Sequence, residues 1–318
     1  MAFRLTFLGT SAGMPTKTRF VSGLGVECLD NSARKYAPWL LIDCGEGIQY
    51  QLLKTPLKLN KLMAICITHL HGDHCFGVAG LLATMAMQGR REPLTLIAPQ
   101  ALSKLLDTYS LVCELYFDFP INFIAIEDCL ATGVSLEIAQ NHQLHIDFTA
   151  LAHRIASYAF TLTQCLTTKR LALDKLRALN IDKDDYHHYK AQAEFWVNTA
   201  TNCRLVVAGD NSQPELLASA VADAHALVHE CTYTQAVLDK LLANGRDDPK
   251  HTTAKQIACF ARQAGLPLLA LTHFSPRYAP FDNPNEKQPN MGHIRAEIAR
   301  YYSGQVVLAK DLLQVMIE

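Results

Sequence analysis

Short apolar runs alternate with amphipathic segments along this chain, and the alternation predicts its secondary structure. Runs of four to seven mostly apolar residues, bounded by polar or turn residues, are typical of buried strands. The predicted strands are Arg4–Leu8, Gly23–Leu29, Trp39–Ile42, Leu62–Ile67 and Leu94–Ile97. Helical periodicity predicts helices at Gly45–Lys54, Cys75–Gln88, Gln100–Ser110, Thr234–Ala243 and Thr253–Ala264. Strands that alternate with helices indicate an α/β fold.

Length and composition predict one large domain. The chain has 318 residues, of which 49% are hydrophobic, and neither a repeat nor a proline-rich linker divides it. We therefore expect a single domain over residues 1–318. Its ten cysteines are scattered through apolar runs, and residues 1–8 are too short and too polar for a signal core. We expect reduced thiols, a cytoplasmic protein and no membrane span.

The charge balance limits how this chain could hold nucleic acid. A net charge of −1 is not typical of a protein that binds phosphates over its whole surface. Local basic groups can still bind RNA, although each group alone is also typical of a solvated face. These groups are Lys17 with Arg19; Lys54, Lys58 and Lys61; Arg90 and Arg91; and Lys169, Arg170, Lys175 and Arg177.

A dense group of metal-binding side chains follows the predicted strand Leu62–Ile67. Three histidines and one aspartate lie within the six-residue span 69–74, namely His69, His71, Asp73 and His74. In an extended segment residues two apart point the same way, so His69 and His71 can contact one ion. Gly72 permits a turn that brings Asp73 and His74 toward a second ion. Imidazole and carboxylate suit zinc, while Mn²⁺, Co²⁺ and Fe²⁺ remain compatible with this ligand set.

Three further candidates follow apolar, strand-like runs, at the positions where α/β folds place their sites. His153 lies between the runs Ile146–Ala152 and Tyr158–Leu162. Asp210 follows Leu205–Ala208, and His273 follows Pro267–Thr272. Each alone could be an ordinary residue at a strand end. Their order after the first cluster favours a shared metal site.

The cluster of three histidines and one aspartate resembles the signature of the metallo-β-lactamase superfamily. That resemblance implies a metallo-β-lactamase-like four-layer αβ/βα sandwich with two Zn²⁺ ions at its edge. It also implies the ligand assignment. His69, His71 and His153 would bind one ion, Asp73, His74 and His273 the other, and Asp210 both.

Further motifs resemble one branch of that superfamily, the ribonuclease Z family. They are the opening loop Phe7–Arg19, His229–Tyr233, His251–Ala254 and Leu271–Tyr278. The chain departs from the family pattern at Phe20, where asparagine is usual, and in residues 176–195, which lack a glycine-proline element. A small tRNA-binding arm or insertion is expected around residues 165–200.

The resemblance implies a zinc-dependent endoribonuclease that cleaves at the 3′ end of precursor tRNA, leaving a 3′-hydroxyl on the tRNA and a 5′-phosphate on the trailer. Asp73 would orient and deprotonate the attacking water. His251 would protonate the leaving oxygen, with Glu230 holding its imidazole, although these two residues could instead cap a helix and fix a loop. Lys17, Arg19 and Arg277 would bind the substrate, and a homodimer is expected.

Two rival functions use the same residues. One is a phosphodiesterase or esterase that acts on a small substrate, because metal-activated water attacks phosphate and acyl centres alike. The other is a non-catalytic RNA-binding or assembly protein that has kept the fold. Candidates at all seven ligand positions favour an enzyme over the second.

Overall fold

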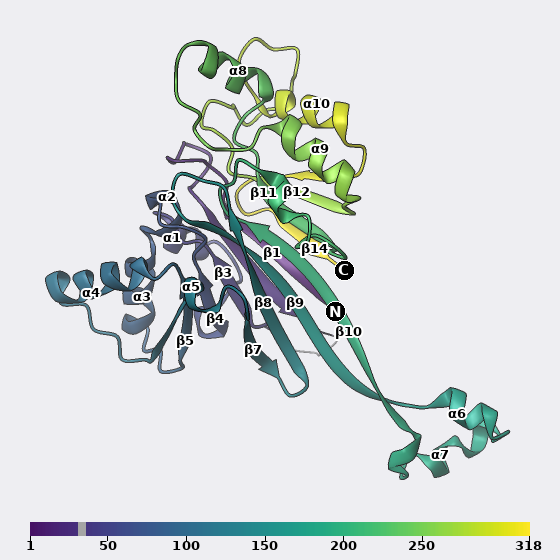
Figure 1. Cartoon of the computed structure of the whole chain (residues 1–318). Coiled ribbons are helices and arrows are strands. Elements are labelled where there is room, and N and C mark those ends of the chain that lie inside the picture. Colours follow the sequence, from purple (N-terminus) through teal and green to yellow (C-terminus); the bar gives the residue numbers. More distant parts are fainter. Residues whose placement is uncertain (31–35) are drawn as a thin grey trace.

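Two seven-stranded sheets face each other at the centre of the molecule, in a computed structural model that describes residues 1–30 and 36–318 (Figure 1). The first sheet contains, in spatial order, β14 (Gln314–Ile317), β1 (Ala2–Gly9), β2 (Gly23–Leu29), β3 (Trp39–Ile42), β4 (Leu62–Cys66), β5 (Leu94–Ala98) and β6 (Ile121–Ala125). The second contains β13 (Gln305–Leu308), β12 (Leu268–Thr272), β11 (Ala226–Glu230), β10 (Trp196–Ala208), β9 (Ser157–Leu171), β8 (His142–Leu151) and β7 (Val134–Ala139).

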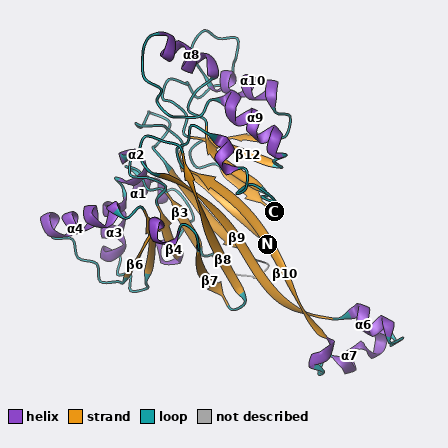
Figure 2. Ribbon diagram, viewed as in Figure 1, coloured by secondary structure: helices purple, strands orange, loops and turns teal. Residues whose placement is uncertain are grey.

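Helices cover the outer face of each sheet (Figure 2). Those of the first half are α1 (Ile48–Leu52), α2 (Gly72–Cys75), α3 (Val78–Met87), α4 (Ala101–Cys113) and α5 (Ile126–Cys129). Those of the second half are α8 (Gln235–Ala243), α9 (Ala254–Ala264) and α10 (Met291–Tyr301). Short 3₁₀ turns occur at Leu59–Lys61, Lys183–Asp185, Ala193–Phe195 and Pro214–Leu217.

Three separate apolar layers hold this arrangement together. The layer between the sheets includes Phe3 and Phe7 of β1 and Phe160 of β9, all nearly or fully buried. A second layer lies under α3, and a third lies under α9, where Ile257 is fully buried. Burial of apolar side chains on both faces of each sheet confirms the predicted four-layer αβ/βα sandwich.

The predicted elements agree with the structure except where a helix is divided. All five predicted strands are present with ends shifted by at most two residues. The helix predicted over Cys75–Gln88 is instead two helices, α2 and α3. The N–H of Gly77 donates to the carbonyl of Cys44 (2.8 Å), and a Cβ at Gly77 would lie 2.2 Å from the carbonyl oxygen of Gly45. This close backbone contact ends the helix there.

A long two-stranded ribbon projects from the second sheet (Figure 1). β9 and β10 pair from Ala159 with Ala208 out to Leu171 with Trp196, whereas β8 accompanies β9 only as far as Leu166. The helices α6 (Leu173–Ala178) and α7 (Tyr186–Tyr189) form the tip of the ribbon. Residues 172–195 are referred to below as the arm tip. Among the helices that the structure describes, none has the length and apolar character needed to cross a bilayer.

Candidate metal centre and its neighbouring residues

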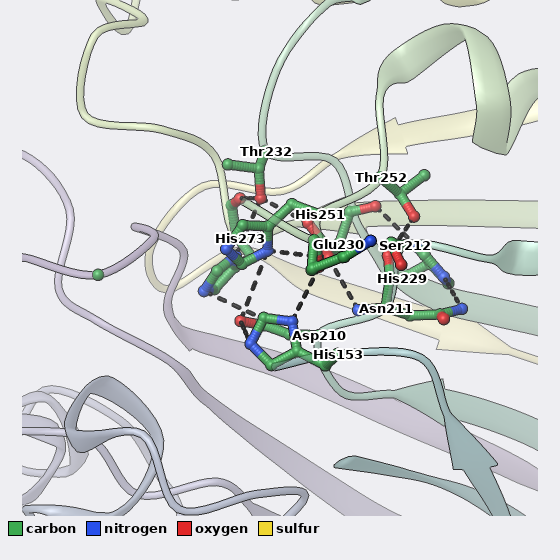
Figure 3. Close-up of polar contacts among 12 residues, drawn as sticks. His153, Asp210, Asn211, Ser212, His229, Glu230, Thr232, His251, Thr252 and His273 are labelled. Atoms are coloured by element: carbon green, nitrogen blue, oxygen red, sulfur yellow. Dashed lines mark hydrogen bonds and ion pairs between the residues drawn. The ribbon is translucent and has the colours of Figure 1, made fainter. Parts of the chain in front are cut away.

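The candidate ligands meet at one edge of the sandwich because several strands end there. The loop after β4 carries His69 to His74, and the turn between β8 and β9 carries His153. β10, β11 and β12 are parallel, so Asp210, Glu230 and His273 are brought to the same edge. Figure 3 shows His153, Asp210, Glu230 and His273 converging from the β8–β9 turn and from the ends of β10, β11 and β12.

The first donor cluster joins three imidazoles and one carboxylate. The Nδ1 atom of His71 lies 3.2 Å from Nε2 of His69 and 3.2 Å from Nε2 of His153. Oδ2 of Asp210 lies 3.6 Å from the His69 nitrogen and 3.8 Å from the His153 nitrogen. These four donor atoms could hold one ion.

The second donor cluster uses the other oxygen of the same aspartate. Nε2 of His273 lies 3.3 Å from Nε2 of His74 and 3.3 Å from Oδ2 of Asp73, and the His74 nitrogen lies 3.5 Å from that oxygen. Oδ1 of Asp210 lies 3.4 Å from the His273 nitrogen and 3.6 Å from the His74 nitrogen. Asp210 therefore faces both clusters.

These separations fit a pair of zinc ions. Tetrahedral zinc with bonds of about 2.0–2.1 Å places its donor atoms roughly 3.3 Å apart. The edges of both clusters lie close to that value, and one carboxylate presents an oxygen to each cluster. Burial and the neighbouring imidazoles lower the pKa of His69 far below its usual value, so its ring is neutral and free to act as a ligand.

Each candidate ligand histidine that presents Nε2 to a cluster has a hydrogen-bond partner for its other nitrogen. Such partners fix the ring orientation and the tautomer of a metal ligand. The Nδ1 partners are Thr68 Oγ1 at 3.0 Å for His69, Asp43 Oδ2 at 2.7 Å for His74, the Lys250 carbonyl at 2.8 Å for His153 and Thr232 Oγ1 at 3.2 Å for His273.

Asp43 is a functional candidate that the sequence analysis missed. Its Oδ1 also accepts from the N–H of Thr68 (2.8 Å), so one carboxylate fixes both the start of the ligand loop and His74. Its backbone is left-handed, with φ of 58°, which is uncommon outside glycine. The available signal was its position directly after the predicted strand Trp39–Ile42, the same signal that identified Asp210.

The opening loop between β1 and β2 reaches the second cluster. The N–H of Gly13 donates to Oδ2 of Asp73 (2.7 Å), and Oγ of Ser22 lies 3.4 Å from Nε2 of His74. Burial raises the pKa of Asp73, but hydrogen bonds from His273 and His74 outweigh burial and hold the pKa well below its usual range. Asp73 is therefore a carboxylate at the mouth of the site.

His251 and the buried Glu230 form a hydrogen-bonded pair beside the clusters (Figure 3). Nδ1 of His251 lies 3.0 Å from Oε1 of Glu230 and 3.6 Å from Oδ2 of Asp210. Burial lowers the pKa of His251, but the Glu230 charge and hydrogen bond raise it to about 9. The imidazole is 18% exposed, so it also reaches the surface of the site. This geometry suits a proton donor.

Glu230 connects the His251 pair to the second cluster. Its Oε1 also accepts from the N–H of Asn211 (2.9 Å), and its Oε2 accepts from Thr232, whose hydroxyl contacts His273. The alternative that His251 caps the following helix is not supported, because Thr253 provides that cap by accepting from the N–H of Gln256.

The three expected substrate-binding residues differ in their accessibility. Lys17 and Arg277 are exposed. Arg19 is only 5% exposed, donates to the Tyr278 carbonyl (2.8 Å) and stacks over the ring of Phe274. The expectation that Arg19 binds substrate is therefore corrected. Its buried guanidinium ties the opening loop to the segment after β12 and is not accessible to a bound RNA.

Comparison with known proteins identifies the family. The profile of a family described as Anti-Pycsar protein Apyc1 matches residues 3–247, so the chain belongs to that family; the match ends before His251 and His273. Ribonuclease Z of Pseudomonas putida (strain GB-1) is 38% identical over 97% of this chain and 95% of its own. Ribonuclease Z of Marinobacter nauticus is 37% identical over 96% and 94%.

Solved structures agree with these matches. Human tRNase Z, short form, superposes with a TM-score of 0.64 and 25% identity, covering 99% of both chains. The metallo-β-lactamase fold protein YhfI from Bacillus subtilis has a TM-score of 0.65 at 19% identity, which supports the fold alone. Relatives named ribonuclease Z match the chain over nearly its full length, and two donor clusters lie side by side in the fold. The chain therefore belongs to the ribonuclease Z family and is a metal-dependent endoribonuclease of the metallo-β-lactamase fold.

Proposed function

We propose that this chain hydrolyses a phosphodiester at the 3′ end of precursor tRNA, leaving a 3′-hydroxyl on the tRNA and a 5′-phosphate on the trailer. The observation that carries the proposal is the double donor cluster shared by Asp210, with the His251–Glu230 pair beside it. Relatives named ribonuclease Z cover both the clusters and that pair.

Two Zn²⁺ ions are the proposed cofactors. His69, His71 and His153 would hold one, Asp73, His74 and His273 the other, and Asp210 both. When bound, such a pair of ions lowers the pKa of water and stabilises charge on phosphate oxygens.

Asp73 is proposed to orient the attacking water and accept its proton. The carboxylate lies at the mouth of the site, where the N–H of Gly13 fixes Oδ2 and leaves the second oxygen for water. The low pKa of Asp73 keeps the group ionised, so its second oxygen can accept a hydrogen bond from the water and orient it.

His251 is proposed to protonate the departing 3′ oxygen. Its Nδ1–H is engaged by Glu230, so Nε2 is the nitrogen that can give a proton to the substrate. Glu230 acts as a positioning residue, because it holds the imidazole in one orientation and favours its protonated form. The same carboxylate supports His273 through Thr232.

Lys17, Arg277 and the arm tip are the proposed contacts to RNA outside the reacting centre. Both side chains are exposed on loops that carry site residues, and the arm tip lies far from the clusters, where it could contact a distant part of the same tRNA (Figure 1). We also propose a homodimer, in which the arm tip of one subunit could hold tRNA for the site of its partner, and a cytoplasmic location.

Cleavage of precursor tRNA by purified protein tests the proposal. We expect cleavage just after the discriminator base, loss of activity with a chelator, recovery on adding zinc, and close to two zinc per chain. Bis(p-nitrophenyl) phosphate is the comparison substrate. Hydrolysis of that compound without cleavage of precursor tRNA would support the rival small-substrate phosphodiesterase instead.

A further inference from the structure

An aromatic and cationic cluster lies beside the candidate metal centre and takes no part in the proposed chemistry. Phe20 of the opening loop and Tyr50 of α1 stack with ring centroids 6.5 Å apart and planes 22° apart. Nζ of Lys54 lies 5.3 Å from the Phe20 centroid and 4.8 Å from the Tyr50 centroid. Tyr50 is 59% exposed. These three residues are called the aromatic platform below.

The aromatic platform is fixed by buried groups beneath it. The N–H of Phe20 donates to Oδ2 of Asp311 (2.7 Å), and Nζ of Lys54 donates to Gln51 (2.9 Å), whose amide bonds the Leu8 carbonyl and Asp311. The Phe20 ring rests on Gly47, where φ is 83° and a Cβ would lie 2.7 Å from the ring. Such a surface binds a ligand without first having to become ordered.

The aromatic platform is close to the reacting centre. Phe20 precedes Ser22 by two residues, so their Cα atoms lie at most about 7.6 Å apart. Oγ of Ser22 lies 3.4 Å from Nε2 of His74, and Gly13 of the same loop contacts Asp73. The loop that contacts the second cluster therefore also carries Phe20, on which Tyr50 stacks, so an RNA strand that leaves the clusters along this loop would meet the platform.

The chemistry of the aromatic platform favours an unpaired nucleotide over an apolar protein surface. Exposed aromatic rings stack on bases of any sequence, and cations beside them pair with phosphates. Within residues 44–61, Lys54, Lys58 and Lys61 outnumber the one acidic residue, Glu46, while Asp311 lies beneath the platform. Charges of that sign suit a nucleic acid and would be costly to bury in a protein contact.

We infer that the aromatic platform binds one unpaired nucleotide adjoining the scissile phosphate, with the base stacked on Tyr50 and its phosphate paired with Lys54. The inference rests on the proposed cleavage of RNA and adds a subsite to it. It also gives a role to Phe20, which stands where the family pattern has asparagine.

The test compares Tyr50→Ala, Tyr50→Phe and Tyr116→Ala on two substrates. Tyr116 is 79% exposed beyond α4 and is the matched control. We expect Tyr50→Ala to lower the ratio of kcat/KM for precursor tRNA to that for bis(p-nitrophenyl) phosphate by about 10-fold, mainly through KM. Tyr50→Phe retains the ring, so it should stay near wild type, as should Tyr116→Ala.

Abasic substitution of the RNA makes the test specific for stacking. Among the nucleotides on either side of the cleaved bond, one abasic position should reduce wild-type cleavage by a similar factor and cause no further loss with Tyr50→Ala. The inference would be overturned if the losses from the abasic position and from Tyr50→Ala were fully additive. It would also be overturned if Tyr50→Ala left the ratio of kcat/KM for the two substrates at the wild-type value.

Sedimentation of the same variants separates the remaining outcomes. If Tyr50→Ala changes the subunit number and lowers activity equally on both substrates, the surface is a protein contact and the inference is wrong. If wild-type protein hydrolyses the small phosphodiester but never cleaves precursor tRNA, the proposed function itself fails. If the wild-type protein cleaves precursor tRNA and Tyr50→Ala leaves the ratio of kcat/KM for the two substrates unchanged, the subsite fails and the proposed function stands.

Discussion

The edge that carries the candidate metal ligands and the arm tip differ in how deeply their side chains are buried. At the edge, His69, His74 and His273 are nearly fully buried, and each has a second hydrogen-bond partner. At the arm tip few side chains are buried, among them Leu176 and Phe195. Catalysis needs donor atoms fixed within a few tenths of an ångström, which a sheet core provides, whereas a surface for gripping a large substrate can be a separate projection.

Charge separates the two regions as well. Residues 165–200 contain six lysine or arginine residues and five aspartate or glutamate residues. A nearly balanced segment offers weak overall attraction to RNA, so any grip by the arm tip must come from how its charges are placed. The opening loop, with exposed Lys17 near Asp73, is the stronger candidate for direct phosphate contact.

Asp210→Ala should have the largest effect, because it removes the carboxylate that presents one oxygen to each donor cluster. We expect activity on precursor tRNA and on the small phosphodiester to fall by at least about 10³-fold. The zinc content of the variant should be lower than the two ions per chain that we expect for the wild-type protein. Exposed Asp107→Ala on α4 is the matched control, and an Asp210→Ala protein with full zinc and activity would refute the shared-ligand assignment.

His251→Ala should come next and should separate chemistry from metal binding. Loss of the proton donor should lower the single-turnover cleavage rate by about 10²-fold or more while bound zinc is retained. Glu230→Gln should cause a smaller loss, because the imidazole remains but its charged partner does not. A His251→Ala protein that cleaves at the wild-type rate would remove this residue from the mechanism.

Replacing residues 173–194 by a short turn tests whether the arm tip serves only the large substrate. We expect KM for precursor tRNA to rise by roughly 10-fold, and hydrolysis of bis(p-nitrophenyl) phosphate to persist, since the ribbon lies outside the clusters. Equal losses on both substrates would mean that the arm tip supports the catalytic edge itself.

Lys17→Ala should have the smallest effect, a loss of a few-fold in tRNA affinity at about physiological salt. One phosphate contact fewer should reduce the slope of log affinity against log salt by about 1. Lys104→Ala, on exposed α4, is the matched control. An unchanged slope for Lys17→Ala would exclude Lys17 as a phosphate contact.

Arg19→Ala should instead lower the melting temperature of the protein, because the Arg19 guanidinium is buried against Phe274.

Local sequence patterns located five of the strands, five of the helices and all seven metal-ligand candidates. Apolar runs can be recognised from neighbouring residues, and the histidine spacing in the loop after β4 already constrains where those side chains point. The same reasoning placed His153, Asp210 and His273 at strand ends, where the structure brings them together.

Only the tertiary structure decided which residues share an environment. His273 approaches Asp73 across 200 residues of chain, Asp43 becomes the partner of His74, and Arg19 turns inward to Tyr278. The helix expected through Gly77 is broken there by a contact with the Cys44 and Gly45 backbone. Burial and hydrogen-bond partners depend on the packing of segments that are remote in sequence, and a local pattern carries no record of that packing.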